Sequence, residues 1–195
     1  MNPEGNRPSV YGTMRVILNY LNSPQEKKNL SANLAAIRNS TGKRDEYAAG
    51  VWPILIPFMP SEFLGRGTLT YEEKALLTTV QLYAVGQQGS DKILNDESGS
   101  MGKSLRGIRI METNTTALDR RFNAMLTSTT FDEFAYHLRQ LVKLGKSKSG
   151  FSVNFPGLAQ DLFLYQIGKN KQICLKWAVD YYRTNFKETN HQSEK

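Results

Sequence analysis

The residues most able to do chemistry in this sequence are the lysines and arginines between positions 103 and 148. This segment holds nine basic and four acidic residues, a net charge of +5, whereas residues 1–102 sum to zero and residues 149–195 carry +2. The whole chain has a net charge of +7 and a sequence pI of about 9.5. Positive charge confined to one part of a chain favours a localised anionic partner: nucleic acid, anionic lipid or an acidic protein.

Three consecutive predicted helices supply this charge. Arg139, Lys143 and Lys146 are spaced four and three residues apart, so they form one stripe on a helix whose apolar face points elsewhere. Guanidinium groups bind phosphate oxygens through paired hydrogen bonds, and lysine acts as a point charge. Without interleaved exposed aromatic side chains, we expect sequence-tolerant contacts to the nucleic-acid backbone, with a merely solvated basic surface as the alternative. The candidates are Lys103, Arg106, Arg109, Arg120, Arg121, Arg139, Lys143 and Lys146.

A second candidate for chemistry is Gly102-Lys103-Ser104, which has the form of the end of a phosphate-binding P-loop. The complete motif needs a glycine at position 97, where Glu97 stands. It also needs a preceding strand, but residues 87–96 form a polar stretch. We therefore interpret the tripeptide as a coincidence.

The remaining residues offer no catalytic or metal-binding set. Cys174 is the only cysteine, which excludes an internal disulfide and a cysteine-based zinc site. His137 lies between apolar positions, and no nucleophile or carboxylate stands at a suitable spacing from it. His191 lies in a polar tail. We expect a protein that is not an enzyme and has no cofactor and no metal.

The elements that must position the basic residues are helices. Apolar residues recur at helical spacing, no alternating strand pattern occurs, and four segments match the capping-box pattern of a helix start. The fold prediction is an all-α bundle of roughly eight or nine helices. The four capping boxes begin at Ser23, Thr70, Thr116 and Thr130. The helices are expected near residues 10–21, 24–39, 44–52, 71–83, 101–111, 117–126, 131–142, 156–166 and 169–186.

The bundle is expected to form two small lobes. Residues 86–102 lose the apolar pattern and read as a linker, so we predict an N-terminal lobe over 1–95 and a basic C-terminal lobe over 96–195. The longest apolar run, residues 51–59, is broken by two prolines and is too short to span a bilayer. With no signal segment at the N-terminus, we expect a cytoplasmic protein without a membrane partner.

Several segments, taken in order, resemble the CasB family, the small subunits of the type I-E CRISPR surveillance complex, Cascade. The most specific are Ala117-Leu-Asp-Arg-Arg-Phe122 and His137-Leu-Arg-Gln-Leu-Val142. The resemblance covers roughly residues 10–186 and is carried further by Leu34-Ala-Ala-Ile-Arg38 and Gly102-Lys-Ser-Leu105. In the family, the first of these segments has a second arginine, where this chain has Asn39.

This resemblance implies a non-catalytic helical subunit that is present as a pair in the effector complex. Its implied partners are a second copy of itself, the guide-RNA-binding backbone subunits, the large subunit, the guide RNA and the target DNA. Its implied role is to hold the target and displaced DNA strands of the R-loop through basic residues. The family pattern adds Arg38 to the candidates and supports Arg106, Arg120, Arg121, Arg139 and Lys143.

Three functional hypotheses follow. The first is a Cascade small subunit that stabilises the R-loop in antiviral defence. The second is a basic helical adaptor for an acidic protein or an anionic membrane. The third, the weakest, is an enzyme that binds a nucleotide at Gly102-Lys103-Ser104. Guide RNA that copurifies with the protein would favour the first hypothesis.

Overall fold

Apolar residues at helical spacing build α-helices throughout the computed structural model, which describes residues 8–41, 50–89, 94–96, 99–148 and 150–183. The all-α prediction is confirmed for these residues. The predicted helix at 44–52 falls largely outside them. The α-helices are α1 (Val10–Leu21), α2 (Leu30–Ser40), α3 (Trp52–Leu55), α4 (Tyr71–Gly86), α5 (Met101–Met111), α6 (Thr116–Leu126), α7 (Phe131–Gly145), α8 (Phe155–Leu164) and α9 (Asn170–Tyr182).

Two of the four predicted capping boxes are found at helix starts, one completely and one in part. At α4 the capping box is complete, because Glu73 N donates to Thr70 Oγ1 (3.1 Å) and Thr70 N donates to the Glu73 carboxylate (2.8 Å). At α7 the Thr130 hydroxyl accepts from Glu133 N, but the Glu133 carboxylate accepts from Thr129 N instead of Thr130 N.

The other two predicted capping boxes are wrong. At α6 the residue preceding the helix is Thr115, which provides no side-chain cap: its hydroxyl donates to Asp119 (2.8 Å), and the Asp119 carboxylate also accepts from Arg109 and Tyr181. Ser23 does accept from Glu26 N (3.4 Å), yet only turns follow and α2 begins at Leu30.

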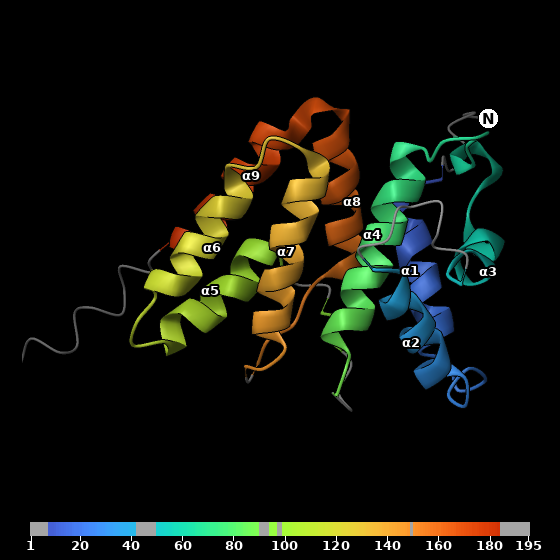
Figure 1. Cartoon of the computed structure of the whole chain (residues 1–195), viewed down its shortest axis with the longest axis horizontal. Coiled ribbons are helices and arrows are strands. Elements are labelled where there is room, and N and C mark those ends of the chain that lie inside the picture. The colour runs from blue at the N-terminus through green and yellow to red at the C-terminus, as the bar shows by residue number, and fades with distance from the viewer. Residues whose placement is uncertain (1–7, 42–49, 90–93, 97–98, 149, 184–195) are drawn as a thin grey trace, which may run out of the picture.

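The helices stand side by side, with α6 and α9 at one end of the molecule and α1, α2 and α3 at the other (Figure 1). Helix α8 packs against both α1 and α4, while α4 also contacts α2 and α7. At the far end α6 packs on α7 and α5 packs on α9. One apolar cluster runs from α1 to α9, so helices on both sides of residue 95 contribute to it. The two-lobe division stays a prediction.

Helices α4 and α7 run parallel. Near their N-terminal ends Lys74 Nζ lies 2.8 Å from Asp132 Oδ1, and just past their C-terminal ends Lys146 Nζ lies 3.0 Å from Gln88 Oε1. Each contact joins residues that are 58 positions apart in the sequence, so α4 and α7 keep the same register relative to each other at both ends. This pairing holds the C-terminal end of α7 beside the C-terminal end of α4.

The described part of the predicted linker is held against the chain near α8. Val153 N donates to Leu94 O (2.8 Å), and Asp96 N donates to Val153 O (3.1 Å), which gives a single parallel bridge. The Asn95 side chain accepts from Phe155 N at the start of α8. The connection into α5 is therefore bonded to the start of α8.

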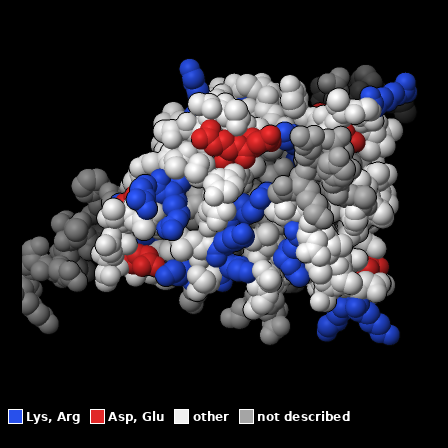
Figure 2. Space-filling view, viewed as in Figure 1, with Lys and Arg blue, Asp and Glu red and all other residues white. Residues whose placement is uncertain are grey.

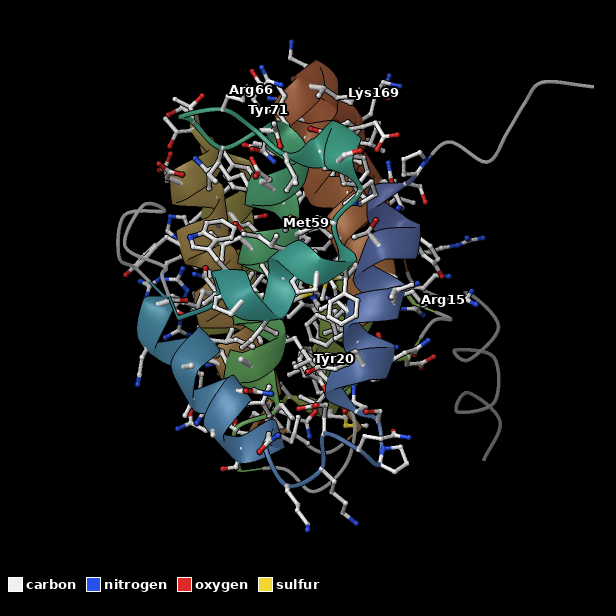
Figure 3. All side chains as sticks on the ribbon, turned by 90° about the vertical axis from the view of Figure 1, so that its right-hand side faces the viewer. Arg15, Tyr20, Met59, Arg66, Tyr71 and Lys169 are labelled. Carbon is white, nitrogen blue, oxygen red and sulfur yellow. The ribbon has the colours of Figure 1, made fainter. Side chains whose placement is uncertain are left out.

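On the side shown in Figure 3, α3 lies in front of α4, and the 3-10 turn Ile56–Phe58 that follows it contacts α1; a second 3-10 turn spans Ser61–Phe63. Tyr20 of α1 packs on Phe58 with ring centroids 4.7 Å apart, and Met59 is buried. Arg15 points to solvent on this side. Within the described residues, no helix is both long and apolar enough to cross a membrane.

Candidate nucleic-acid interface

Basic side chains gather over α6 and α7 on one face of the molecule (Figure 2). The basic residues of these helices and of the α7 C-cap form what we call the basic band: Arg120, Arg121, Arg139, Lys143 and Lys146. Acidic atoms on the same face lie over the start of α7, where the first helical turn contains Asp132 and Glu133. The helix dipole favours this arrangement, which leaves the rest of α7 free for positive charge.

Helix α6 presents Arg120 and Arg121 to solvent because Phe122, the residue that follows them, is buried on the face that packs inward. Phe122 is fully buried and stacks on Tyr181 of α9, with ring centroids 3.9 Å apart. Both arginines lie outside this packing, and the only hydrogen bond of their side chains within the described residues is a long one from Arg121 to Ala117 O (3.5 Å). Their guanidinium groups are therefore available to an external anion.

Arg139 on α7 is the most unusual of these residues. Its Nε is buried and has no hydrogen-bond acceptor within the described residues, and the side chain forms no ion pair there. Burial lowers the pKa of this guanidinium below the ordinary arginine value. A desolvated donor without a partner costs free energy.

Lys143 and Lys146 continue the band toward α4. Lys143 is exposed, and Lys146 donates to the Gln88 side chain (3.0 Å) and to its main-chain oxygen (3.5 Å). Gln88 carries no charge, so the positive charge of Lys146 is not neutralised by this contact. Arg139 and Lys143 lie on α7 and Lys146 is its C-cap, and tertiary packing adds the contact between Lys146 and Gln88, just past α4.

Arg38 lies at the other side of the same α4 terminus. It is in the last turn of α2, and it lines a cavity together with Gln87 and Gln88. Arg38 and Lys146 therefore flank Gln88 from two helices that are more than one hundred residues apart in the sequence. The sequence interpretation missed Lys27, which lines this cavity too.

The basic residues of α5 are placed differently. Arg109 Nε lies 2.9 Å from Asp119 Oδ1, and its guanidinium also lies over the rings of Tyr181 and Tyr182. Its charge is thus compensated within the chain. Lys103 is exposed and Arg106 half-buried, and their side chains form no hydrogen bond or ion pair within the described residues. Just beyond the α7 C-cap, Lys148 forms an ion pair with Glu112, which follows α5.

The contacts around Asp119 join α5, α6 and α9. Burial by itself would raise the pKa of Asp119, but hydrogen bonds from Arg109, Tyr181 and Thr115 bring that pKa below its ordinary value. Hydrogen bonding to Asp119 raises the pKa of Arg109. Burial is the largest cause that raises the pKa of Tyr181, and the hydrogen bond to Asp119 raises it further. The carboxylate stays charged and fixes α6 in the rotation that exposes Arg120 and Arg121.

Helix packing explains Gly102-Lys103-Ser104. A Cβ on Gly102 would lie 2.3 Å from the main-chain oxygen of Trp177, so only glycine allows α5 to approach α9 this closely. The start of α5 is capped by Ser100, whose hydroxyl accepts from Lys103 N (3.2 Å) and donates to Asp180 Oδ2 (2.5 Å). A carboxylate beside this helix start opposes phosphate binding there.

The other chemical candidates remain isolated. His137 is half-buried with its ring beside that of Tyr136, and Cys174 is half-buried with its thiol pKa raised by burial. No group of three or more histidine, cysteine, aspartate or glutamate side chains suited to a metal occurs in the described part of the chain. The candidate site in the described part of the chain therefore consists of basic side chains.

Comparison with known proteins identifies relatives of this chain. Residues 33–182 match the family model of the CRISPR-associated protein Cse2. The solved CasB from Thermobifida fusca matches with a TM-score of 0.67 and 20% identity, covering 89% of this chain and 96% of that chain. CasB from Thermus thermophilus gives 0.65 and 22%, over 87% and 97%, and a chain of a CRISPR RNA-guided surveillance complex gives 0.66 and 17%, over 90% and 94%. No curated protein sequence matches.

Proposed function

The chain belongs to the CRISPR-associated Cse2 family, and from this premise we propose that it is a non-catalytic small subunit of a cytoplasmic CRISPR Cascade complex. The likeness to a chain of an RNA-guided surveillance complex supports this placement. Its partners in that complex are a second copy of itself, the guide-RNA-binding backbone subunits and the large subunit.

The role of the subunit is to bind the sugar–phosphate backbone of the target and displaced DNA strands and thereby stabilise the R-loop. An R-loop replaces one duplex by another of similar stability, so modest backbone contacts can shift the balance. The guide RNA supplies sequence specificity, which agrees with a surface that contacts phosphates and reads no bases. The basic band, Arg38, Lys103, Arg106 and Arg109 are the candidate contacts, although Arg109 is already paired with Asp119.

The observation that carries this proposal is the uncompensated charge of Arg139. Surface arginines are common, but Arg139 has a buried Nε without an acceptor and no acidic partner within the described residues, so no internal counter-charge neutralises its guanidinium. Arg121 on α6 and Lys143 on α7 also form no ion pair within the described residues. Three such cations on adjoining helices match the spread of charge on a nucleic-acid backbone.

The test is a triple substitution of Arg121, Arg139 and Lys143 by alanine in the assembled complex. We expect weaker retention of DNA and a log–log salt dependence that is shallower by about 0.7–0.9 for each phosphate that the variant no longer neutralises. The matched control replaces Arg15, Arg66 and Lys169, three exposed residues outside the basic band, which removes the same charge (Figure 3).

The control triple variant should change DNA retention and its salt slope little. If both triple variants reduced retention equally, the effect would be one of net charge and the assignment of the band would fail. If the band variant assembled normally and retained DNA with unchanged affinity and slope, nucleic-acid binding at this face would be refuted.

A further inference from the structure

A cavity of about 740 Å³ lies between α2 and the C-terminal end of α4. Ser31, Leu34 and Arg38 of α2 line it at spacings of three and four residues, so they share one face of the helix. Lys27, in the turns before α2, lines it from the same side, and Gln88 belongs to the opposite wall. We call this cavity the α2–α4 pocket.

The pocket combines two kinds of lining. Leu30 and Leu34 give it an apolar part, whereas Lys27 and Arg38 give it two positive charges. None of the described residues that line it is acidic, and neither cation forms an ion pair within the described part of the chain. Just outside, Lys146 contacts Gln88 and adds a third positive charge. Such a site suits a ligand that has an apolar part and an anionic part.

Its size restricts the ligand further. The volume falls within the range of about 300–1,000 Å³ that is typical of small-molecule sites, so the pocket can take a group as large as a nucleotide. A duplex cannot place a base in it without flipping that base out, which costs a few kcal/mol. A single strand offers unpaired bases without this cost. The pocket should therefore distinguish single strands from duplexes.

We propose that the α2–α4 pocket binds one unpaired nucleotide of a single-stranded nucleic acid, with its base against Leu30 and Leu34 and its phosphate at Lys27 and Arg38. This inference rests on the proposed function and adds to it, because the basic band contacts only the backbone. The lining residues include no aromatic ring, so the base is held by apolar packing and not by stacking. The nucleotide could come from the displaced DNA strand or from RNA.

Two neighbouring substitutions on α2 test the proposal. Ser31 and Ala32 are both exposed, but only Ser31 lines the pocket. Ser31→Phe should fill the pocket while leaving all charges in place, and Ala32→Phe is its matched control. The probes are fluorescent single strands of about twelve nucleotides. One strand carries thymine bases, a second has the same backbone without bases, and a third is RNA with uracil bases.

The full-length wild-type chain should bind the base-bearing DNA strand about fivefold more tightly than the abasic strand, because packing a base against Leu30 and Leu34 removes apolar surface from water. Ser31→Phe should abolish this preference without changing the affinity for the abasic strand. Ala32→Phe should keep the preference. Tighter binding of the RNA strand would identify RNA as the source of the nucleotide, and tighter binding of the base-bearing DNA strand would identify the displaced strand. Equal affinities would support recognition of the base and phosphate that both strands share.

The outcomes separate this proposal from the proposed function. If Ser31→Phe keeps the preference for bases, or if the wild type shows none, the pocket proposal is overturned while backbone binding by the basic band stands. If Ser31→Phe loses affinity for the abasic strand as well, the pocket has no specific role in holding the base, and the proposal also fails. If the wild type binds none of the strands, alone or in the assembled complex, both proposals fail.

Discussion

The Arg109 guanidinium holds the Asp119 carboxylate with Nε 2.9 Å from Oδ1 and a terminal nitrogen 3.4 Å from Oδ2. The same carboxylate accepts from the Tyr181 hydroxyl at 2.6 Å, so three helices meet at one acidic group. A charge satisfied by several donors stabilises a fold more than an exposed ion pair does. This pair sets the position of α6, and with it that of Arg120 and Arg121.

Replacing Asp119 by asparagine should therefore lower the free energy of unfolding by about 1–3 kcal/mol, since Arg109 and Tyr181 lose a charged acceptor. Urea denaturation followed by circular dichroism measures the change. The control is Asp132→Asn, whose side chain is 80% exposed and pairs with Lys74. That change should cost about 0.5 kcal/mol or less. Equal losses in the two variants would contradict the role given to Asp119.

The same carboxylate predicts a dependence on pH. Its pKa in the folded chain is below the ordinary value, so its contribution is present above the unfolded pKa of about 3.9 and is lost as the pH falls through the folded pKa. The stability difference between the wild type and Asp119→Asn should thus shrink on going from about pH 7 to about pH 3. A difference that stays constant over this window would show that Asp119 does not titrate as argued.

Arg139 should show opposite effects on stability and on binding. Arg139→Met keeps an apolar stem but removes the unpaired Nε, so the free energy of unfolding should rise by about 1 kcal/mol. DNA retention by the assembled complex should weaken about fivefold, the equivalent of about 1 kcal/mol. Lys143→Met is the control, because an exposed lysine should lose binding without the gain in stability. A less stable Arg139→Met variant would refute the argument from burial.

Two glycines of α5 provide a matched pair. Gly102→Ala should destabilise the chain by about 2 kcal/mol or more, since its Cβ would lie 2.3 Å from the Trp177 oxygen. Gly107→Ala, in the same helix, meets no atom within 4 Å and should stabilise the chain by about 1 kcal/mol through helix propensity. Thermal unfolding compares the two. A tolerated alanine at position 102 would mean that α5 and α9 are not held as closely as described.

Much of the fold could be predicted from the sequence because it depends on local patterns. The apolar spacing of α1 and the capping box at Thr70 act within a few residues, and both were predicted correctly. One failure comes from competition by residues far away in the sequence. Thr116 and Asp119 have the spacing of a capping box, but Arg109 and Tyr181 bind the carboxylate that the box would need.

The candidate site was predictable only in part. Spacing alone predicted the stripe, and in the structure Arg139 and Lys143 lie on α7 while Lys146 is its C-cap. No local pattern pointed to Lys27, because it precedes α2 and reaches the pocket from the turns before that helix. Nor could one reveal that Arg109 is paired with Asp119, or that Lys146 reaches Gln88, because these contacts depend on how α5, α6, α4 and α7 pack.

The length of the charged stripe on α7 limits how many phosphates of a nucleic-acid strand it can contact. Arg139 and Lys146 are seven residues apart, and at 1.5 Å per residue the stripe covers about 10 Å. Phosphates of one strand in a B-form duplex advance about 3.4 Å each, so α7 spans about three of them. A strand that extends further must pass to α6, to the end of α4 or to a neighbouring subunit. Under the proposed function, α7 of one copy thus contacts only a short part of a strand, and a longer strand needs these further contacts.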